Sequence, residues 1–107
     1  MVTKHWNDPV HPGEILADEL EYIGMTASEL AGKIGVPKNR LYQIINGTRS
    51  ITADTALRLA AFFKTSAGIW MNLQKSYELD VVAKEIGNSL KKITPYDSKT
   101  SHSSQLF

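Results

Sequence analysis

The fold is decided by residues 30–37, which read Leu-Ala-Gly-Lys-Ile-Gly-Val-Pro. Ala31 is small enough to let a following helix cross closely, and Gly35 can adopt the positive φ that a sharp corner between helices requires. Val36 can fill the angle between the two helices. Pro37 can begin the next helix, because a missing backbone N–H costs nothing in a first helical turn. The stretch therefore predicts two short helices joined by a tight turn.

The helices on either side of this turn have recognisable ends. Thr26-Ala-Ser-Glu29 is a capping box, in which the hydroxyl and the carboxylate satisfy backbone N–H groups at the start of a helix near 27–34. Leu41 and Ile44 lie on one face of the following helix, and Asn46-Gly47 ends it. We interpret the pair as a helix-turn-helix. Its second helix is anchored by an apolar face, so its polar face can enter a DNA major groove.

Three further helices are predicted around this pair, which makes the chain an all-α protein of five helices. One lies near 13–23, a fourth is capped by Thr52 and a fifth by Ser66. We expect Trp70, Leu73 and Tyr77 to lie in the core rather than to form a stacking platform for single-stranded nucleic acid. The apolar positions expected on the fourth helix are Ala56, Leu57, Leu59, Ala60 and Phe63. We expect Leu57, like Ile44, to be packed in the core between the helices.

Beyond Tyr77 the helical pattern continues with a new apolar stripe. The expected divisions are an N-terminal arm at 1–10, a helix-turn-helix domain at 11–80, a C-terminal helical extension at 81–93 and a disordered tail at 94–107. The stripe lies beyond a complete five-helix domain, so we expect it to form a homodimer interface. The alternative is that it folds back on its own domain. The interface residues are Leu79, Val82, Ile86 and Leu90.

The near-neutral charge of the chain conceals two segments of opposite sign. The 107 residues carry a formal net charge of +1. Every charged residue from Asp8 to Glu29 is acidic, and every charged residue from Lys33 to Arg49 is basic. Such a division indicates separate partners for separate faces, although two solvated faces of a neutral domain would give the same pattern.

Catalysis, metal binding and membrane insertion have little support in the sequence. Cysteine is absent, and His5, His11 and His102 have no metal-ligand spacing, so we expect His11 only to pack at the start of the first helix. Acidic side chains on that helix are expected to be solvated, where they repel DNA or attract a basic protein. No apolar run approaches the roughly 20 residues of a membrane span. We therefore expect a soluble cytoplasmic protein that is not an enzyme and has no cofactor.

Three segments resemble a known family. Leu30-Ala31 to Asn46-Gly47 is similar to the Cro/C1-type (XRE) helix-turn-helix family of repressors, whose domain is lambda-repressor-like. His11-Pro12-Gly13-Glu14-Ile15-Leu16, together with residues 51–60 and 65–79, resembles the HigA antitoxin subfamily. The resemblance covers about residues 11–80.

The resemblance implies which residues contact DNA. The expected base contacts, from the start and middle of the second helix of the motif, are Lys38, Asn39, Arg40, Tyr42 and Gln43. Asn and Gln can bond adenine bidentately, and Lys or Arg can bond guanine. The expected phosphate contacts are Thr48, Arg49, Ser50 and Thr52. In one departure from the family, Pro37 stands where many relatives have a serine or threonine cap.

The function implied is that of a sequence-specific transcriptional repressor and antitoxin. Such a protein binds a palindromic operator in double-stranded DNA as a homodimer, neutralises a RelE-like mRNA-cleaving toxin and represses its own operon. Two alternatives remain open. One is a phage-type or metabolic repressor without a toxin partner, and the other is a protein-interaction module that has lost DNA binding.

Overall fold

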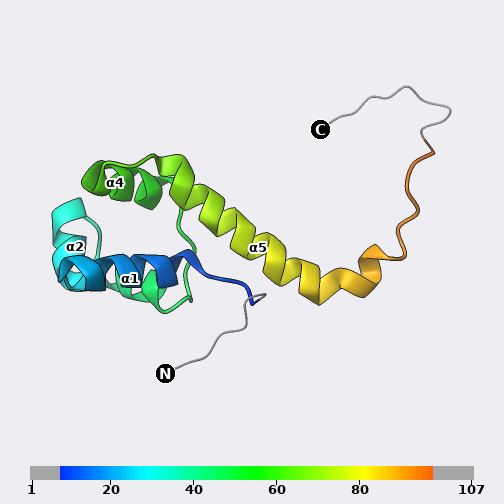
Figure 1. The fold of residues 1–107 in the computed structure, drawn as a ribbon, viewed down its shortest axis with the longest axis horizontal. Helices are drawn as coiled ribbons and strands as arrows, with labels where there is room; N and C mark the ends of the chain where they lie inside the picture. The colour runs from blue at the N-terminus through cyan, green and yellow to red at the C-terminus, as the bar shows by residue number, and fades with distance from the viewer. Residues whose placement is uncertain (1–7, 98–107) are drawn as a thin grey trace.

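The computed structural model describes residues 8–97, which form five helices and contain no strand (Figure 1). The helices are α1 (Pro12–Ile23), α2 (Ala27–Ile34), α3 (Lys38–Ile45), α4 (Ala53–Phe63) and α5 (Ala67–Leu90). The predicted all-α class is confirmed, and α1 and α2 begin and end within one residue of their predicted bounds. Much of the expected arm (1–7) and tail (98–107) lies outside the described residues.

The corner between α2 and α3 has the predicted geometry. Gly35 ends α2 in the left-handed conformation, with φ 76° and ψ 36°. The N–H groups of Gly35 and Val36 both donate to the Ala31 carbonyl, at 2.9 and 3.0 Å, and Ala31 and Val36 are buried. The glycine thus satisfies the end of one helix while the chain turns into the next.

The capping box at the start of α2 is also present. The Glu29 N–H donates to Thr26 Oγ1 at 3.0 Å, and the Thr26 N–H donates to the Glu29 carboxylate at 2.8 Å. The hydrogen bond from the Thr26 backbone holds the pKa of Glu29 below its usual value. The helix that leads into the corner therefore begins at a defined residue.

The helices enclose one core, and one predicted core residue is wrong. Leu16, Leu30, Leu41, Ile44, Ile51 and Leu59 are almost completely buried, and Trp70 joins them from α5. Leu57 is 62% exposed. The buried face of α4 is formed by Thr55, Ala56 and Leu59, and Leu57 lies 100° around the helix from Ala56, so it faces solvent.

Gly13 allows α1 and α3 to approach each other closely. A Cβ atom placed on Gly13 would collide with the backbone carbonyl of Ile44 in α3. No side chain other than hydrogen fits this crossing, because the obstacle is backbone rather than a flexible side chain. Helix α3 therefore lies directly against the start of α1.

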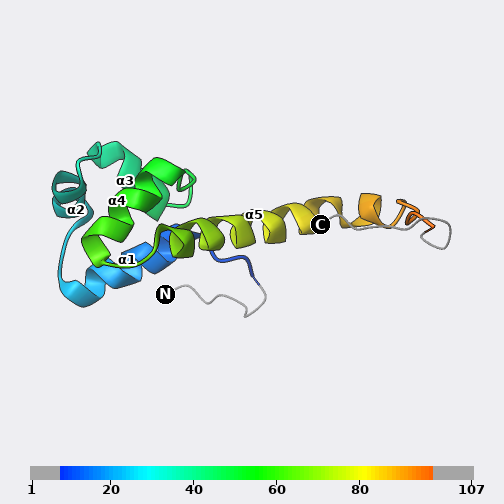
Figure 2. The same ribbon diagram turned by 90° about the horizontal axis from the view of Figure 1, so that it is seen from above.

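The predicted fifth helix and most of the C-terminal extension lie in one long element, α5, which has a kink at Ile86. The first part of α5 packs against α4 and α1, and the remainder projects away from the domain (Figures 1 and 2). Ile86 departs from helical geometry, with φ −112° and ψ 15°, next to Gly87. The stripe residues Leu79, Val82, Ile86 and Leu90 are 40 to 71% exposed, so the stripe does not fold back on its own domain. Within residues 8–97, no helix is long and apolar enough to cross a membrane.

Candidate nucleic-acid interface

The recognition helix α3 is anchored on one side and open on the other. Leu41 and Ile44 are fully buried and attach the helix to the core. Pro37 stands at the N-cap with φ −63° and ψ 143°, and no side chain caps the helix. Four of the five residues predicted to contact bases are exposed to solvent; they are Lys38, Asn39, Tyr42 and Gln43.

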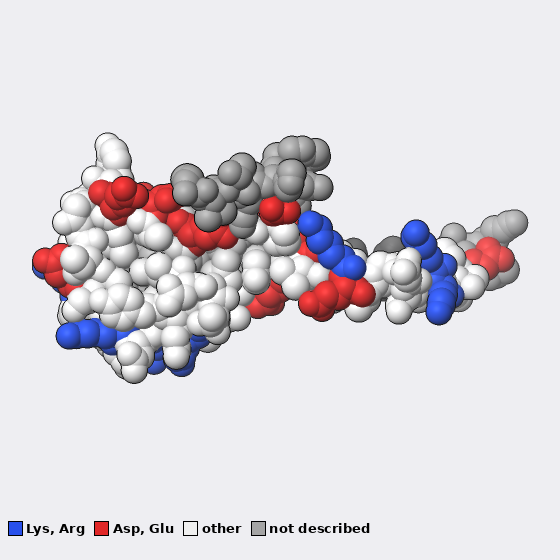
Figure 3. Space-filling model, turned by 90° about the horizontal axis from the view of Figure 1, so that it is seen from below, with Lys and Arg blue, Asp and Glu red and all other residues white. Residues whose placement is uncertain are grey.

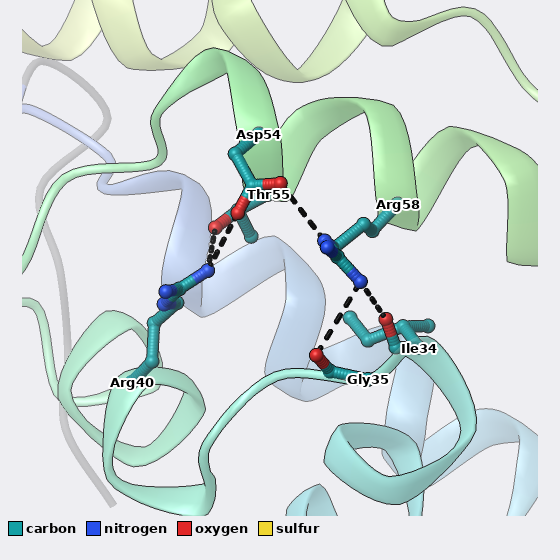
Figure 4. Close-up of polar contacts among 6 residues, drawn as sticks. All are labelled: Ile34, Gly35, Arg40, Asp54, Thr55 and Arg58. Carbon is teal, nitrogen blue, oxygen red and sulfur yellow. Dashed lines mark hydrogen bonds and ion pairs between the residues drawn. The ribbon is translucent and has the colours of Figure 1, made fainter.

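Arg40, the fifth predicted base contact, faces α4 instead of open solvent. Its Nη1 donates to an Asp54 carboxylate oxygen at 2.9 Å and lies 3.5 Å from the Thr55 hydroxyl (Figure 4). Asp54 lies in the first turn of α4, so the pair joins the recognition helix to the next helix. In this structure the Arg40 guanidinium is therefore engaged with α4 through Nη1.

Arg58 completes this connection and was not identified from the sequence. Its Nε donates to Asp54 at 2.9 Å, and its Nη1 donates to the carbonyls of Ile34 at 2.8 Å and Gly35 at 3.3 Å (Figure 4). The carboxyl end of α2 is the negative end of its dipole, so a guanidinium there satisfies carbonyls that lack helical partners. The i,i+4 spacing of Asp54 and Arg58 was the available signal.

The two arginines determine the protonation of Asp54. Hydrogen bonds from Arg58 first, and then from Arg40, hold the pKa of Asp54 below its usual value. The two guanidinium groups thus favour the ionised form of Asp54, which accepts a hydrogen bond from each of them. This arrangement links α2, α3 and α4 through one exposed carboxylate.

The residues predicted to contact phosphate follow directly after α3 and touch it. Arg49 Nη1 donates to Gln43 Oε1 at 2.9 Å, and the Thr48 backbone N–H and hydroxyl both contact the Gln43 carbonyl. Ser50 and Thr52 are exposed, and Thr52 is the N-cap of α4 without a capping bond from its side chain. The structure thus brings Gln43 beside Arg49, so that one predicted base contact and one predicted phosphate contact are neighbours.

His11 lies behind this surface, at the start of α1 where it was expected to pack. It is buried, and its Nδ1 accepts a hydrogen bond from the Gly13 N–H at 2.8 Å. Burial lowers the pKa of His11, against the opposing effect of a hydrogen bond to the Arg49 backbone and of Glu14 nearby. In the described part of the chain, no group of three His, Asp or Glu residues could hold a metal ion. His5 and His102 lie outside that part.

Charge divides the surface of the domain. Figure 3 shows acidic side chains gathered along the edge that α1 forms, and basic side chains on the opposite edge. The predicted separation of acidic and basic segments in the sequence thus becomes a separation in space. The basic edge favours an anionic partner and the acidic edge disfavours one.

This geometry defines a helix-turn-helix domain, with a tight glycine corner and an exposed polar recognition helix. The Helix-turn-helix family model matches residues 19–70. Virulence-associated protein I of Dichelobacter nodosus is 42% identical over 77 residues, which cover 71% of this chain and 71% of that protein.

Two solved structures that are similar to this chain belong to one subfamily of helix-turn-helix proteins. An addiction module antidote protein of the HigA family from Coxiella burnetii is 50% identical, with a TM-score of 0.81 over 83% of this chain and 99% of that one. Antitoxin HigA of Pseudomonas aeruginosa, solved with the higBA promoter, is 39% identical, with a TM-score of 0.78 over 81% of this chain and 97% of that one. The chain belongs to the HigA antitoxins of the XRE-type helix-turn-helix family.

Proposed function

We propose that this HigA-type DNA-binding regulator represses its own operon and neutralises a RelE-like mRNA-cleaving toxin. The observation that carries the DNA-binding half is the exposed polar face of α3, which follows a rigid corner and adjoins a basic segment. The similar antitoxin HigA of Pseudomonas aeruginosa was solved with the higBA promoter, which supports this assignment. The proposal requires no catalytic group and no cofactor.

Base recognition is assigned to the exposed side of α3. The amides of Asn39 and Gln43 match the donor and acceptor of adenine, and Lys38 matches guanine. Tyr42 offers an apolar ring to a thymine methyl group. Arg40 can contact a base as well if its ion pair with Asp54 breaks. Breaking this ion pair would then be one step of operator binding.

The phosphate contacts are assigned to residues 48–52. Arg49 provides a positive charge, and the start of α4 provides backbone N–H groups at the positive end of a helix dipole. The hydroxyls of Thr48, Ser50 and Thr52 provide further donors. Such contacts position the protein on the duplex without reading its sequence.

Two copies of the chain are proposed to dimerise through the exposed stripe on α5. The stripe projects from the domain with its apolar side chains in solvent, and a second copy of the same helix would cover them. A symmetric dimer presents two recognition helices about 34–36 Å apart and therefore requires a palindromic operator.

The dimer is tested by placing charges in the stripe. Val82→Asp with Ile86→Asp should give a folded monomer by sedimentation, with weak operator binding. The control, Asn88→Asp with Lys92→Gln, changes the net charge equally at exposed positions outside the stripe and should stay dimeric. A wild-type chain that sediments as a monomer at micromolar concentrations would overturn the proposal.

DNA binding is tested by a mobility-shift titration on the DNA upstream of the chain's own gene, over a range of salt concentrations. A phosphate-bound complex loses affinity linearly in log salt, with a slope of about −0.9 per contact. Binding that does not prefer this DNA to a scrambled duplex would favour a protein-interaction module. The toxin half is tested by sequencing the DNA on either side of the gene and by co-purification with any small basic protein that is encoded there. Absence of a complex, with operator binding intact, would favour a repressor without a toxin partner.

A further inference from the structure

A buried glutamine on α5 contacts the segment that the proposed function assigns to DNA phosphates. Gln74 is only 3% exposed. Its Oε1 accepts a hydrogen bond from the Ile51 backbone N–H at 2.8 Å, and its Nε2 donates to the Glu78 carboxylate at 2.9 Å. A carboxylate can only accept hydrogen bonds, so Glu78 binds the NH₂ side of the amide and leaves the oxygen for Ile51. Glu78 therefore orients Gln74.

This hydrogen bond fixes the backbone in the middle of the phosphate-contacting segment. Ile51 is buried, whereas Ser50 and Thr52 on either side are exposed. Without Gln74 the Ile51 N–H would be a buried donor with no acceptor, which is costly. Residues 48–52 are thus held from inside by a side chain that is itself buried.

A second residue of α5, Tyr77, lies one helical turn after Gln74 and supports the same segment through His11. His11 is buried beside this segment, where the Arg49 backbone raises the pKa of its ring against the effect of burial, and its ring edge meets the Tyr77 ring of α5 with 4.8 Å between ring centroids. Figure 1 shows the segment between α3 and α4 passing beside α5. Two residues of α5, one turn apart, therefore support the segment, one directly and one through His11.

We propose that Gln74 is a positioning residue for DNA binding, holding residues 48–52 so that Arg49 and the start of α4 face the phosphates. The proposal rests on the proposed DNA-binding function and adds a residue to it. Since α3 is anchored separately by Leu41 and Ile44, loss of Gln74 should weaken phosphate contact more than it alters base preference, which it can affect only through the contacts of Arg49 and Thr48 with Gln43.

The test uses two substitutions at Gln74 and one compensating change. Gln74→Met removes the acceptor at similar size, and should lower operator affinity about tenfold, the value of a hydrogen bond to a charged group. The salt slope should become shallower by about 0.9, one phosphate contact. Gln74→Glu places two carboxylates face to face and should weaken binding similarly. Adding Glu78→Gln restores the pair with the roles exchanged, and should recover wild-type affinity and slope.

The controls separate this inference from the function on which it rests. If the wild-type chain does not bind its upstream DNA, the proposed function fails. If Arg49→Ala makes the salt slope shallower and folded Gln74→Met does not, the proposed function stands and the positioning role is overturned. If Gln74→Met does not fold, Glu78→Ala decides the matter. Weaker binding than the equally charged Glu85→Ala supports the role, and equal binding overturns it.

Discussion

Arg58 joins α4 to the corner between α2 and α3, and its replacement by methionine tests whether this joint stabilises the fold. Arg58 donates to the carbonyls of Ile34 and Gly35 and to the Asp54 carboxylate. A hydrogen bond from a charged donor contributes about 1.5–3 kcal/mol, but the Gly35 bond is long, so we expect Arg58→Met to lower the free energy of unfolding by about 2 kcal/mol. Little of this should come from Asp54, because both side chains of that ion pair are about half exposed.

Urea unfolding of Arg58→Met, Asp54→Asn and the double variant separates the two contributions. Asp54→Asn leaves the carbonyl contacts in place, so it should cost little, and the loss caused by Arg58→Met should persist in its background. An unchanged urea midpoint for Arg58→Met would refute the reasoning. So would an effect that disappears in the Asp54→Asn background, because it would place the stabilisation in the ion pair.

Three other predictions follow from described contacts. Gln43→Ala should cost about 1–3 kcal/mol of operator binding and relax discrimination at one base pair, measured by titration on single-base operator variants. Ile44→Ala should lower the free energy of unfolding by about 2–5 kcal/mol because Ile44 is fully buried, whereas Leu57→Ala, at an exposed position, should change it by under about 0.5 kcal/mol. Burial lowers the pKa of His11 from its ordinary 6.5, so the unfolded chain binds the proton first as pH falls. The free energy of unfolding should be constant above about pH 6.5 and should decline as the pH falls toward the pKa of His11 in the folded chain. Asparagine can also cap a helix but does not titrate, so His11→Asn should remove this part of the pH dependence, measured by urea unfolding at several pH values.

The corner of the helix-turn-helix could be predicted because its determinants are local. The Gly35 N–H and the Thr26–Glu29 capping box make hydrogen bonds to residues only three or four positions away. Residues that are close in the sequence are therefore also close in the structure, and the pattern can be read directly. The other three helices could be predicted in the same way from their caps and apolar spacing, and the family resemblance added the expected DNA contacts. Leu57 was misplaced because Ala56 and Leu57 are adjacent and apolar, and helical periodicity alone does not decide which of them faces the core.

The residues that the sequence left unidentified act across distances that a linear pattern does not contain. Gln74 follows its backbone partner Ile51 by 23 residues, and as a polar residue on a helix it resembles an ordinary surface position. Arg58 reaches back to Ile34, 24 residues earlier. The contact between Gly13 and Ile44 depends on where two helices cross. Each became visible only once the helices were placed against one another.

Only the first turns of α5 pack against other helices, and its outer turns have few tertiary contacts. From Glu78 to Leu90 its side chains are exposed, apart from the half-buried Val81 and Gly87. An isolated helical segment of this length is marginal in water, and the irregular geometry at Ile86 weakens its last turns. In a single copy, helical order therefore decreases outward from the anchored first turns, and the outer turns fray. Pairing with another copy would supply the missing tertiary contacts, so ordering these turns and associating would be one coupled event whose extent rises with protein concentration.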